Sequence, residues 1–247
     1  MSRGKEKAAA RVAQEIVDTI RAEGLQPGDR YLSEAEALQR HGVSRATFRE
    51  SLRFLEMLGV VRVRTGPGGG AIVRWPGPPH LASALALLLQ FRSAPLSSVL
   101  DARAVIEPSI AAEAATNATP EMIATLRRHL AEAEQRIEDQ PAFAAAYRAF
   151  WEGVAAATGN PILALLWPAL RALTDSGGFI PSADYRTQLV GRMRVLLAAI
   201  EAGDAAEAAA IIAALDSEFA RRLTASYPER MARPLAWSEV SIDGEGP

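Results

Sequence analysis

Three arginines at four-residue spacing, Arg45, Arg49 and Arg53, mark the segment 42–55. If this segment is helical, each step of four residues turns the side chain by only about 40° past a full turn, so the three guanidinium groups form one stripe. A guanidinium donates N–H groups in a fixed plane that suits phosphate oxygens and the major-groove edge of guanine. A stripe of this kind also occurs on solvated helix faces, so the flanking segments decide between the two interpretations.

Those flanking segments predict a helix-turn-helix. Ser44 can cap the helix that carries the stripe by accepting a hydrogen bond from a first-turn N–H. A shorter helix precedes it, with Ser33 as its cap and Glu36 placed to complete a capping box. A tight turn over 41–44 joins the two helices, the layout of helix-turn-helix motifs. The second helix has an apolar face made by Phe48, Leu52 and Leu55.

A first helix over 8–22 and a β-hairpin over 60–74 complete the predicted N-terminal unit. Two short runs rich in β-branched residues, 60–64 and 71–74, flank a Gly-rich tip. Such a tip can approach the sugar-phosphate backbone or enter the minor groove, with Arg62, Arg64 and Arg74 standing near it. No Gly-Lys-Ser/Thr follows the glycines, which argues against a nucleotide-binding loop. The hairpin is therefore predicted to be the wing of a DNA-binding domain.

Composition limits the class of protein. The chain has 247 residues, 49% of them hydrophobic and only 6% aromatic, and alanine dominates the hydrophobic fraction, which favours helices. Residues 1–75 hold 13 Lys or Arg and 9 Asp or Glu, a net charge of +4, against −6 for the remainder, which suggests a polyanion partner for the first part. With no cysteine, no long apolar stretch and no signal-peptide pattern, we expect a cytoplasmic protein without a membrane partner.

The rest of the chain predicts an all-α bundle of six or seven helices. A Pro-rich linker over 76–80 separates it from the N-terminal domain, 1–75, and the bundle is expected over 81–226. Residues 227–247 are expected to form a flexible tail. The helical patterns fall at 81–91, 95–116, 120–139, 141–157, 161–175, 184–202 and 204–224.

The N-terminal motifs resemble the winged-helix domain of the GntR family of bacterial transcription regulators. The resemblance covers roughly residues 8–74 and rests on Gln26 to Arg30, Ser33-Glu34, Gly42 to Arg45 and Arg49 to Leu52. Ala35 stands where the family usually has Arg, so one expected DNA contact is missing. The resemblance and the arginine stripe together predict a DNA-binding site made of Ser44, Arg45, Thr47, Arg49, Arg53, Arg64, Gly68, Gly69 and Gly70.

The C-terminal bundle resembles the FCD ligand-binding domain of the FadR-like branch of that family. The resemblance rests on Leu100 to Arg103, Glu107-Pro108, Gly159 to Leu163 and Ala199 to Ala205. Many members of that branch bind a divalent metal through one Asp and three His. The corresponding positions here cannot supply such ligands, so no cofactor is expected. They are Tyr147, Trp151, Met193 and Leu215.

These four replacements lie on apolar helix faces, which leaves a filled core or a metal-free cavity open. The cavity interpretation gives Tyr147 and Trp151 the role of flat apolar walls for a carboxylate or an acyl-type effector. Arg103 is the candidate carboxylate-binding residue, or else it forms an internal salt bridge to Glu107. Arg148, Arg171, Arg192 and Arg194 cannot be ranked. The predicted ligand-binding residues are Arg103, Glu107, Tyr147, Trp151, Met193 and Leu215.

The sequence thus predicts a mostly α protein in which a winged helix-turn-helix is joined to an FCD-type bundle. Its expected function is ligand-responsive regulation of transcription, as a repressor that binds a palindromic operator as a homodimer. The alternative is a constitutive DNA-binding regulator whose C-terminal domain only dimerises. An enzyme is not expected, because the chain has no cysteine, no Ser-His-Asp order and no metal constellation. The histidines His41, His80 and His129 are expected to be surface or packing residues.

Overall fold

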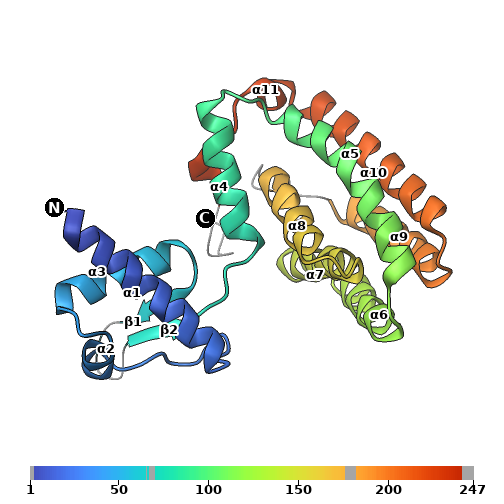
Figure 1. Cartoon of the computed structure of the whole chain (residues 1–247). Helices are drawn as coiled ribbons and strands as arrows, with labels where there is room; N and C mark the ends of the chain where they lie inside the picture. The colour runs from blue at the N-terminus through green and yellow to red at the C-terminus, as the bar shows by residue number, and fades with distance from the viewer. Residues whose placement is uncertain (1–2, 65, 67–69, 176–181, 241–247) are drawn as a thin grey trace. The chain divides into compact units, whose positions relative to one another are not determined.

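The computed structural model describes residues 3–64, 66, 70–175 and 182–240. The chain divides into two compact units, Met1–His80 and Leu81–Pro247 (Figure 1). This division falls at the end of the predicted linker. Each unit has its own hydrophobic core and is described separately below.

The first unit is a winged helix-turn-helix. Three helices precede a two-stranded antiparallel sheet. The backbone of residues 28–31 runs along the free side of its second strand, with Tyr31 N donating to Ala71 O at 2.9 Å. The chain order predicted from the sequence is confirmed. The elements are α1 Arg3–Ala22, α2 Glu34–His41, α3 Arg45–Met57, β1 Val61–Arg64 and β2 Gly70–Val73.

Local sequence signals set the ends of α2 and α3. Ser33 forms the predicted capping box with Glu36, and Ser44 accepts a hydrogen bond from Thr47 N at 3.3 Å. Gly42 ends α2 with a φ of 61°, a left-handed conformation that glycine adopts without steric cost. These contacts fix where α3 begins, and they place the arginine stripe on its outer face.

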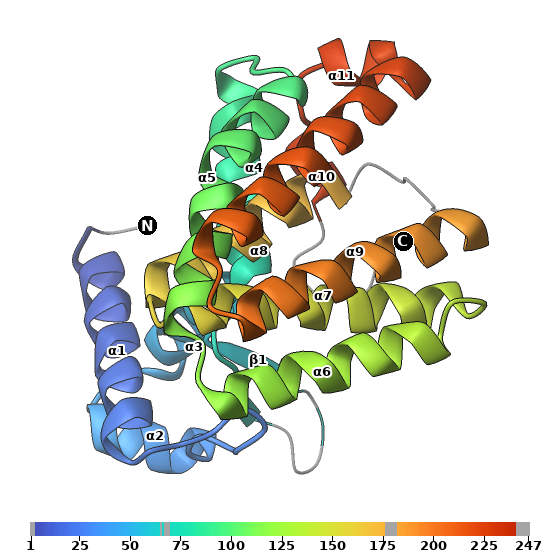
Figure 2. The same cartoon turned by 90° about the vertical axis from the view of Figure 1, so that its right-hand side faces the viewer.

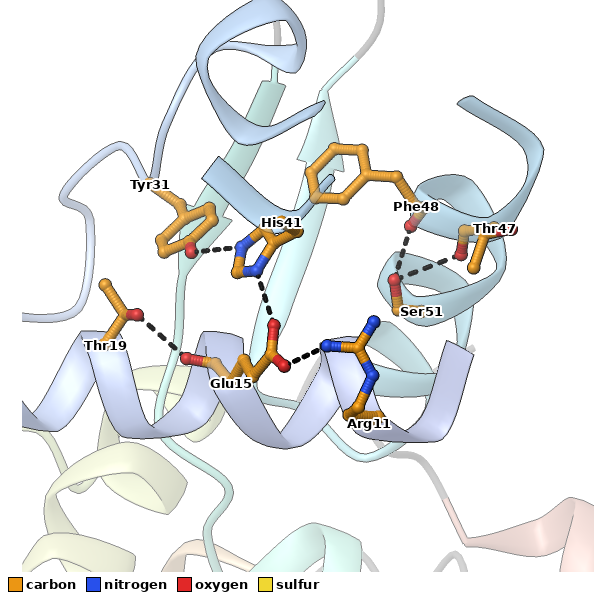
Figure 3. A network of polar contacts seen from close by, with 8 residues as sticks. All are labelled: Arg11, Glu15, Thr19, Tyr31, His41, Thr47, Phe48 and Ser51. Carbon is orange, nitrogen blue, oxygen red and sulfur yellow. Dashed lines mark hydrogen bonds and ion pairs between the residues drawn. The ribbon is translucent and has the colours of Figure 1, made fainter. Parts of the chain in front are cut away.

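A polar network inside the first unit ties its three helices together (Figure 3). His41, at the end of α2, is buried between Glu15 of α1 and Tyr31, with ring-nitrogen distances of 2.9 Å to Glu15 Oε2 and 3.0 Å to Tyr31 OH. The hydrogen bond from His41 is the leading cause that lowers the pKa of Glu15. The His41 ring also stacks on Phe48 of α3, with centroids 6.4 Å apart. His41 is therefore a packing residue that holds the stripe-bearing helix against α1.

Gly59, after α3, is a second position whose backbone conformation favours glycine. Its φ is 75°, in the left-handed region that residues with a Cβ rarely adopt. The His80 ring packs directly on its backbone, and a Cβ placed on Gly59 would lie 1.9 Å from His80 Nε2, so the ring would have to move. The φ angle explains why glycine separates α3 from the wing.

The second unit is a helical bundle, and its described residues contain no strand with regular pairing. Helices α5 and α10 run side by side, as both views show (Figures 1 and 2). Helix α6 packs on α7 and α9, and α8 packs on α5 and α7. The seven predicted helices are confirmed as α4 Pro78–Phe91, α5 Ser97–Asn117, α6 Pro120–Gln135, α7 Gln140–Ala157, α8 Pro161–Asp175, α9 Ala183–Glu201 and α10 Ala205–Ser226.

Aromatic and aliphatic side chains of α7, α9 and α10 form the main core of the bundle. The predicted apolar faces are confirmed for Phe143, Phe150, Met193 and Ile200, which are at most 2% exposed. Trp151 contacts both Phe150 and Trp167 through its ring, with centroids 5.4 and 5.6 Å apart. A second cluster joins α4, α5 and α8 to the end of the described chain.

Two sequence predictions are wrong at the ends of the bundle. The Pro-rich stretch 76–80 is not purely a linker, because Pro78 opens α4; proline fits the first turn, whose N–H groups need no helical partner. The tail expected from 227 is folded as far as 240. It contains α11, Pro228–Ala232, and a 3₁₀ turn, Trp237–Glu239. Leu235 and Val240 are buried in the cluster with α4, and Trp237 Nε1 donates to Ser83 Oγ at 2.7 Å. Residues 241–247 lie outside the described part.

Candidate functional site

The first candidate site is the exposed face of α3. Arg45, Arg49 and Arg53 are all exposed, as the spacing predicted, while the opposite face of the helix is buried in the core. Arg49 has its side chain 68% exposed and pairs with Glu34 at the start of α2, with Nε 3.3 Å from Oε1. This pair orients Arg49 across the helix-turn-helix. Both partners remain in contact with solvent, so the pair is weak and can be exchanged for a phosphate or a base.

The wing adds a second basic element. Arg64 is exposed and lies opposite Gly70 in the hairpin register. Arg30, which the sequence reasoning did not select, runs beside the same glycine: a Cβ on Gly70 would lie 3.3 Å from Arg30 Nε. The predicted contacts Gly68 and Gly69 lie outside the described residues. Ser44 and Thr47 stand at the start of α3, where their hydroxyls are 3.0 Å apart.

The second candidate site is a cavity of about 230 Å³ inside the helical unit. Side chains from α5, α7, α8, α9 and α10 line it, so it lies within the bundle and takes its walls from nearly every helix of the main core. Three of the lining side chains are arginines, and no carboxylate is among the described lining residues. The lining is Arg103, Gln140, Phe143, Ala144, Tyr147, Arg148, Arg171, Thr174, Tyr185, Leu189, Leu215 and Phe219.

A buried ionic network forms one wall of the cavity. Arg103 donates from Nε to Glu107 Oε1 at 2.7 Å and from Nη2 to Asp216 Oδ1 at 3.3 Å. Its Nη1 donates to Thr174 Oγ1 at 2.7 Å. Arg171 donates from Nη2 to the other oxygen of Glu107 at 2.9 Å. The salt bridge predicted between Arg103 and Glu107 is therefore present, and it is part of a larger network that joins α5, α8 and α10.

The two carboxylates of this network have opposite electrostatic properties. Burial raises the pKa of Glu107, but the charges of Arg171 and Arg103 outweigh burial and the net shift is downward. Burial raises the pKa of Asp216 to about 6, and the nearby charge of Glu107 adds to that effect. Glu107 therefore stays ionised, whereas Asp216 is the group in this network that titrates closest to neutral pH.

The structure separates the predicted ligand-binding residues into two groups. Arg103, Tyr147 and Leu215 line the cavity. Glu107, Trp151 and Met193 lie behind it, buried at 2% exposure or less. Trp151 supports the wall indirectly, because the guanidinium of Arg171 stacks on its ring at 4.0 Å from the centroid.

The positions that correspond to metal ligands in FCD proteins do not fit a metal. Tyr147, Trp151, Met193 and Leu215 belong to or pack against one apolar core cluster, and none offers an imidazole nitrogen or a carboxylate. Across the described part of the chain, no three His, Cys, Asp or Glu side chains are grouped as metal ligands would be. A metal-free cavity remains the prediction.

Sequence reasoning missed half of the ionic network. Arg171 could not be ranked among the arginines, and Asp216 was not considered. The only local signal was the four-residue spacing of Arg103 and Glu107. The partners that complete the network lie 64 and 113 residues away along the chain, where no periodic pattern connects them.

Together, the capped stripe-bearing helix, the wing and the cavity-containing bundle have the architecture of a winged helix-turn-helix DNA-binding protein with a C-terminal helical domain. Comparison with known families agrees. Residues 8–70 match the bacterial regulatory proteins of the gntR family, and residues 98–218 match the FCD domain. The chain belongs to the GntR family of transcription regulators and carries an FCD domain; it is a regulator and not an enzyme.

Two relatives and one solved structure show the extent of the likeness. The chain is 31% identical over 229 residues to an uncharacterized HTH-type transcriptional regulator of Mycobacterium tuberculosis, covering 92% of this chain and 93% of that protein. It is 30% identical over 161 residues to the HTH-type transcriptional repressor NanR of Klebsiella aerogenes, covering 64% and 61%. A GntR protein of Streptococcus agalactiae shares the fold, with a TM-score of 0.64 at 19% identity over 86% of this chain and 99% of that one.

Within the described residues, no helix combines the length and the apolar character that crossing a bilayer requires.

The raised pKa of Asp216 predicts a pH-dependent loss of stability. The folded protein binds this proton more tightly than the unfolded chain, so the free energy of unfolding falls as pH rises from about pH 4 to about pH 7. The side chain of Asn cannot titrate, so Asp216→Asn serves as the reference. Relative to this variant, the free energy of unfolding of the wild type is expected to fall by about 1–3 kcal/mol between these pH values. Urea unfolding at the two pH values measures the difference. The exposed Asp101→Asn variant is the control, and a wild type that tracks Asp216→Asn at both pH values contradicts the assignment.

Proposed function

We propose that this regulator binds a palindromic operator as a homodimer and that a small acidic effector in the cavity changes its affinity for DNA. The observation that carries the proposal is the pairing of two basic sites in one chain. One is the exposed face of α3, which would offer the guanidiniums of Arg45 and Arg49 to a major groove and that of Arg53 to the DNA backbone. The other is the cavity, which offers arginines to an anion among apolar walls.

On operator DNA, Arg45, Thr47 and Arg49 would enter the major groove at the N-terminal end of α3. Arg53 lies further along the helix and would contact only backbone. The wing, with Arg64 and Gly70 at its described base, would follow the adjacent sugar-phosphate chain. A dimer places two such helices one turn of DNA apart, so the operator is expected to contain two short half-sites. Repression follows if the operator overlaps a promoter.

The cavity supports ligand-responsive regulation over the alternative of a constitutive regulator. A bundle that only dimerises does not require an internal space, and the space found here has three arginines among its lining residues. The volume of about 230 Å³ is below the range of drug-sized pockets, which favours a small carboxylate over a long acyl chain.

A mobility-shift assay with the promoter DNA beside its own gene tests the proposal. The shifted band should correspond to one dimer bound per operator. A panel of small carboxylates, fatty acids and acyl-CoA thioesters should include a compound that changes the protein concentration needed for half-maximal DNA binding. That change should be the same with and without a chelator.

A pair of matched variants ties the response to the cavity. Ala144 lines the cavity and Ala145 does not, although both are exposed on α7. Ala144→Trp is expected to keep DNA binding and lose the response, while Ala145→Trp keeps both. DNA binding that no compound alters in any variant would favour the constitutive alternative, and a chelator effect would contradict the metal-free cavity.

A further inference from the structure

The net charge of the ionic network beside the cavity affects whether an anionic ligand can bind there. Its buried members are two guanidiniums, Arg103 and Arg171, and two carboxyl groups, Glu107 and Asp216. All four side chains are at most 9% exposed. When both carboxyl groups are ionised, the network has no net charge. An anion placed against the two arginines would then give the buried network a net negative charge, which is strongly unfavourable. The third arginine of the lining, Arg148, is exposed, so solvent screens its charge and it offsets the excess only weakly.

Asp216 is the member that can remove that charge. Its Oδ1 accepts from Arg103 at 3.3 Å, whereas within the described structure its buried Oδ2 accepts no hydrogen bond. Glu107 is held differently, because each of its oxygens accepts from a guanidinium at 2.9 Å or less. A proton can be placed on Oδ2 of Asp216 without displacing a hydrogen bond, whereas a proton on either oxygen of Glu107 would displace a guanidinium donor. The proton therefore goes to Asp216.

The neighbours of Asp216 on each packed helix support this assignment. Helix α5 faces it with Arg103 and Glu107, and α8 faces it with Arg171. On α9, the helix on the other side of α10, the charged Arg192 pairs with Glu218 and not with Asp216. Burial and the charge of Glu107 already raise the pKa of Asp216 to about 6 before any ligand is present.

The cavity walls set the shape of the anion. The rings of Phe143 and Tyr147 are stacked at 5.7 Å with an interplanar angle of 21°, so they present a flat apolar surface. Phe219 lies on the arginine side, with its ring 5.2 Å from Arg103 Cζ. A space of about 230 Å³ with such walls suits a compact acid with a flat apolar body.

We propose that the cavity binds the carboxylate of a compact aromatic acid against Arg103 and Arg171, and that Asp216 takes up one proton when the acid binds. The inference rests on the proposed function, since it names the effector class and the regulation of the same cavity. It makes the regulator sensitive to pH as well as to its effector. At higher pH the same concentration of acid occupies fewer sites, because binding is coupled to the uptake of a proton and the proton concentration is lower.

Calorimetric titration of the full-length protein with benzoate tests the proposal. Above about pH 6 the dissociation constant is expected to rise toward tenfold per pH unit, since about one proton enters with each ligand. Titrations in buffers of different ionisation enthalpy should report that proton directly. Benzoate itself stays ionised over this range, so the slope belongs to the protein. Benzamide, which has the same shape and no charge, should bind weakly and without a pH slope.

Two variants test whether Asp216 is the group that takes up the proton. Asp216→Asn should bind benzoate with no proton uptake and no pH slope, and more tightly than wild type at about pH 8. Glu207→Gln makes the same chemical change at an exposed position of α10 and should behave as wild type. Circular dichroism confirms that Asp216→Asn is folded before it is titrated.

The other outcomes are distinguishable. Benzoate binding without a pH slope, or with a slope that persists in Asp216→Asn, overturns the proton coupling. If decanoate or an acyl-CoA thioester binds and benzoate does not, the compact aromatic class is wrong while the proposed ligand response stands. If no acid binds and Ala144→Trp changes nothing, both the inference and the proposed ligand response fail, and operator binding by α3 remains.

Discussion

Glu107→Gln is expected to lower the free energy of unfolding of the helical unit by about 3–5 kcal/mol, because it removes the shared partner of two buried arginines. Glu107 is fully buried and accepts from Arg103 on one oxygen and from Arg171 on the other. A neutral amide has only one oxygen to accept with, and its NH₂ group would face a donor. One guanidinium would then remain buried without its counter-charge, and this explains the size of the expected loss.

The pH dependence of this loss gives a second readout. The arginines lower the pKa of Glu107 below its ordinary value, so its contribution is present above the unfolded pKa and is lost as pH falls through the folded one. The difference in the free energy of unfolding between wild type and Glu107→Gln should therefore become smaller at acidic pH. Glu113→Gln, at an exposed position of the same helix, should change stability by less than about 0.5 kcal/mol. Urea unfolding followed by circular dichroism measures all three proteins, and equal midpoints would mean that the network carries no net stability.

The network also marks how far sequence reasoning can reach. Periodicity and capping are local, so Ser44, Phe48 and the ends of α3 could be predicted correctly from a few neighbouring residues. The pair Arg103 and Glu107 has the same local character. What the sequence could not show is which distant side chains complete a buried charge. That depends on how whole helices pack, and Asp216 is 113 residues from Arg103.

The folded end of the chain illustrates the same limit. Segment 227–240 contains two prolines and has no helical or strand period, which is typical of an irregular tail. It is ordered because a few contacts with α4 are favourable: Leu235 is buried, and Trp237 donates to Ser83, a residue 154 positions earlier. A segment without a local pattern can be ordered by contacts with a surface that other parts of the chain form. The composition of the segment alone does not predict those contacts.

Arg49→Ala is expected to weaken binding to the promoter operator by about 10- to 100-fold, the cost of losing one base or phosphate contact of about 1–3 kcal/mol. Part of this loss comes from Glu34. In the wild type the two side chains neutralise each other, with Nε and Oε1 3.3 Å apart. Without Arg49, the carboxylate of Glu34 faces the DNA phosphates alone and repels them. The double variant Glu34→Gln with Arg49→Ala should therefore bind more tightly than Arg49→Ala.

The kind of contact that Arg49 makes can be read from the salt dependence. If Arg49 contacts a phosphate, the slope of log affinity against log salt should fall by about one; if it reads a base, the slope should hold while discrimination between operator and mutated operator falls. Arg53→Ala is the comparison, because Arg53 is also exposed on α3 but lies further from the N-terminal end that enters the groove. Because Arg53 is expected to contact the DNA backbone only, this variant should lower the salt slope and leave discrimination between operators unchanged. If only Arg53→Ala lowered operator affinity, the DNA-contacting part of α3 would lie toward its C-terminal end, contrary to the proposal. An unchanged affinity in both variants would show that the arginine stripe is a solvated face after all.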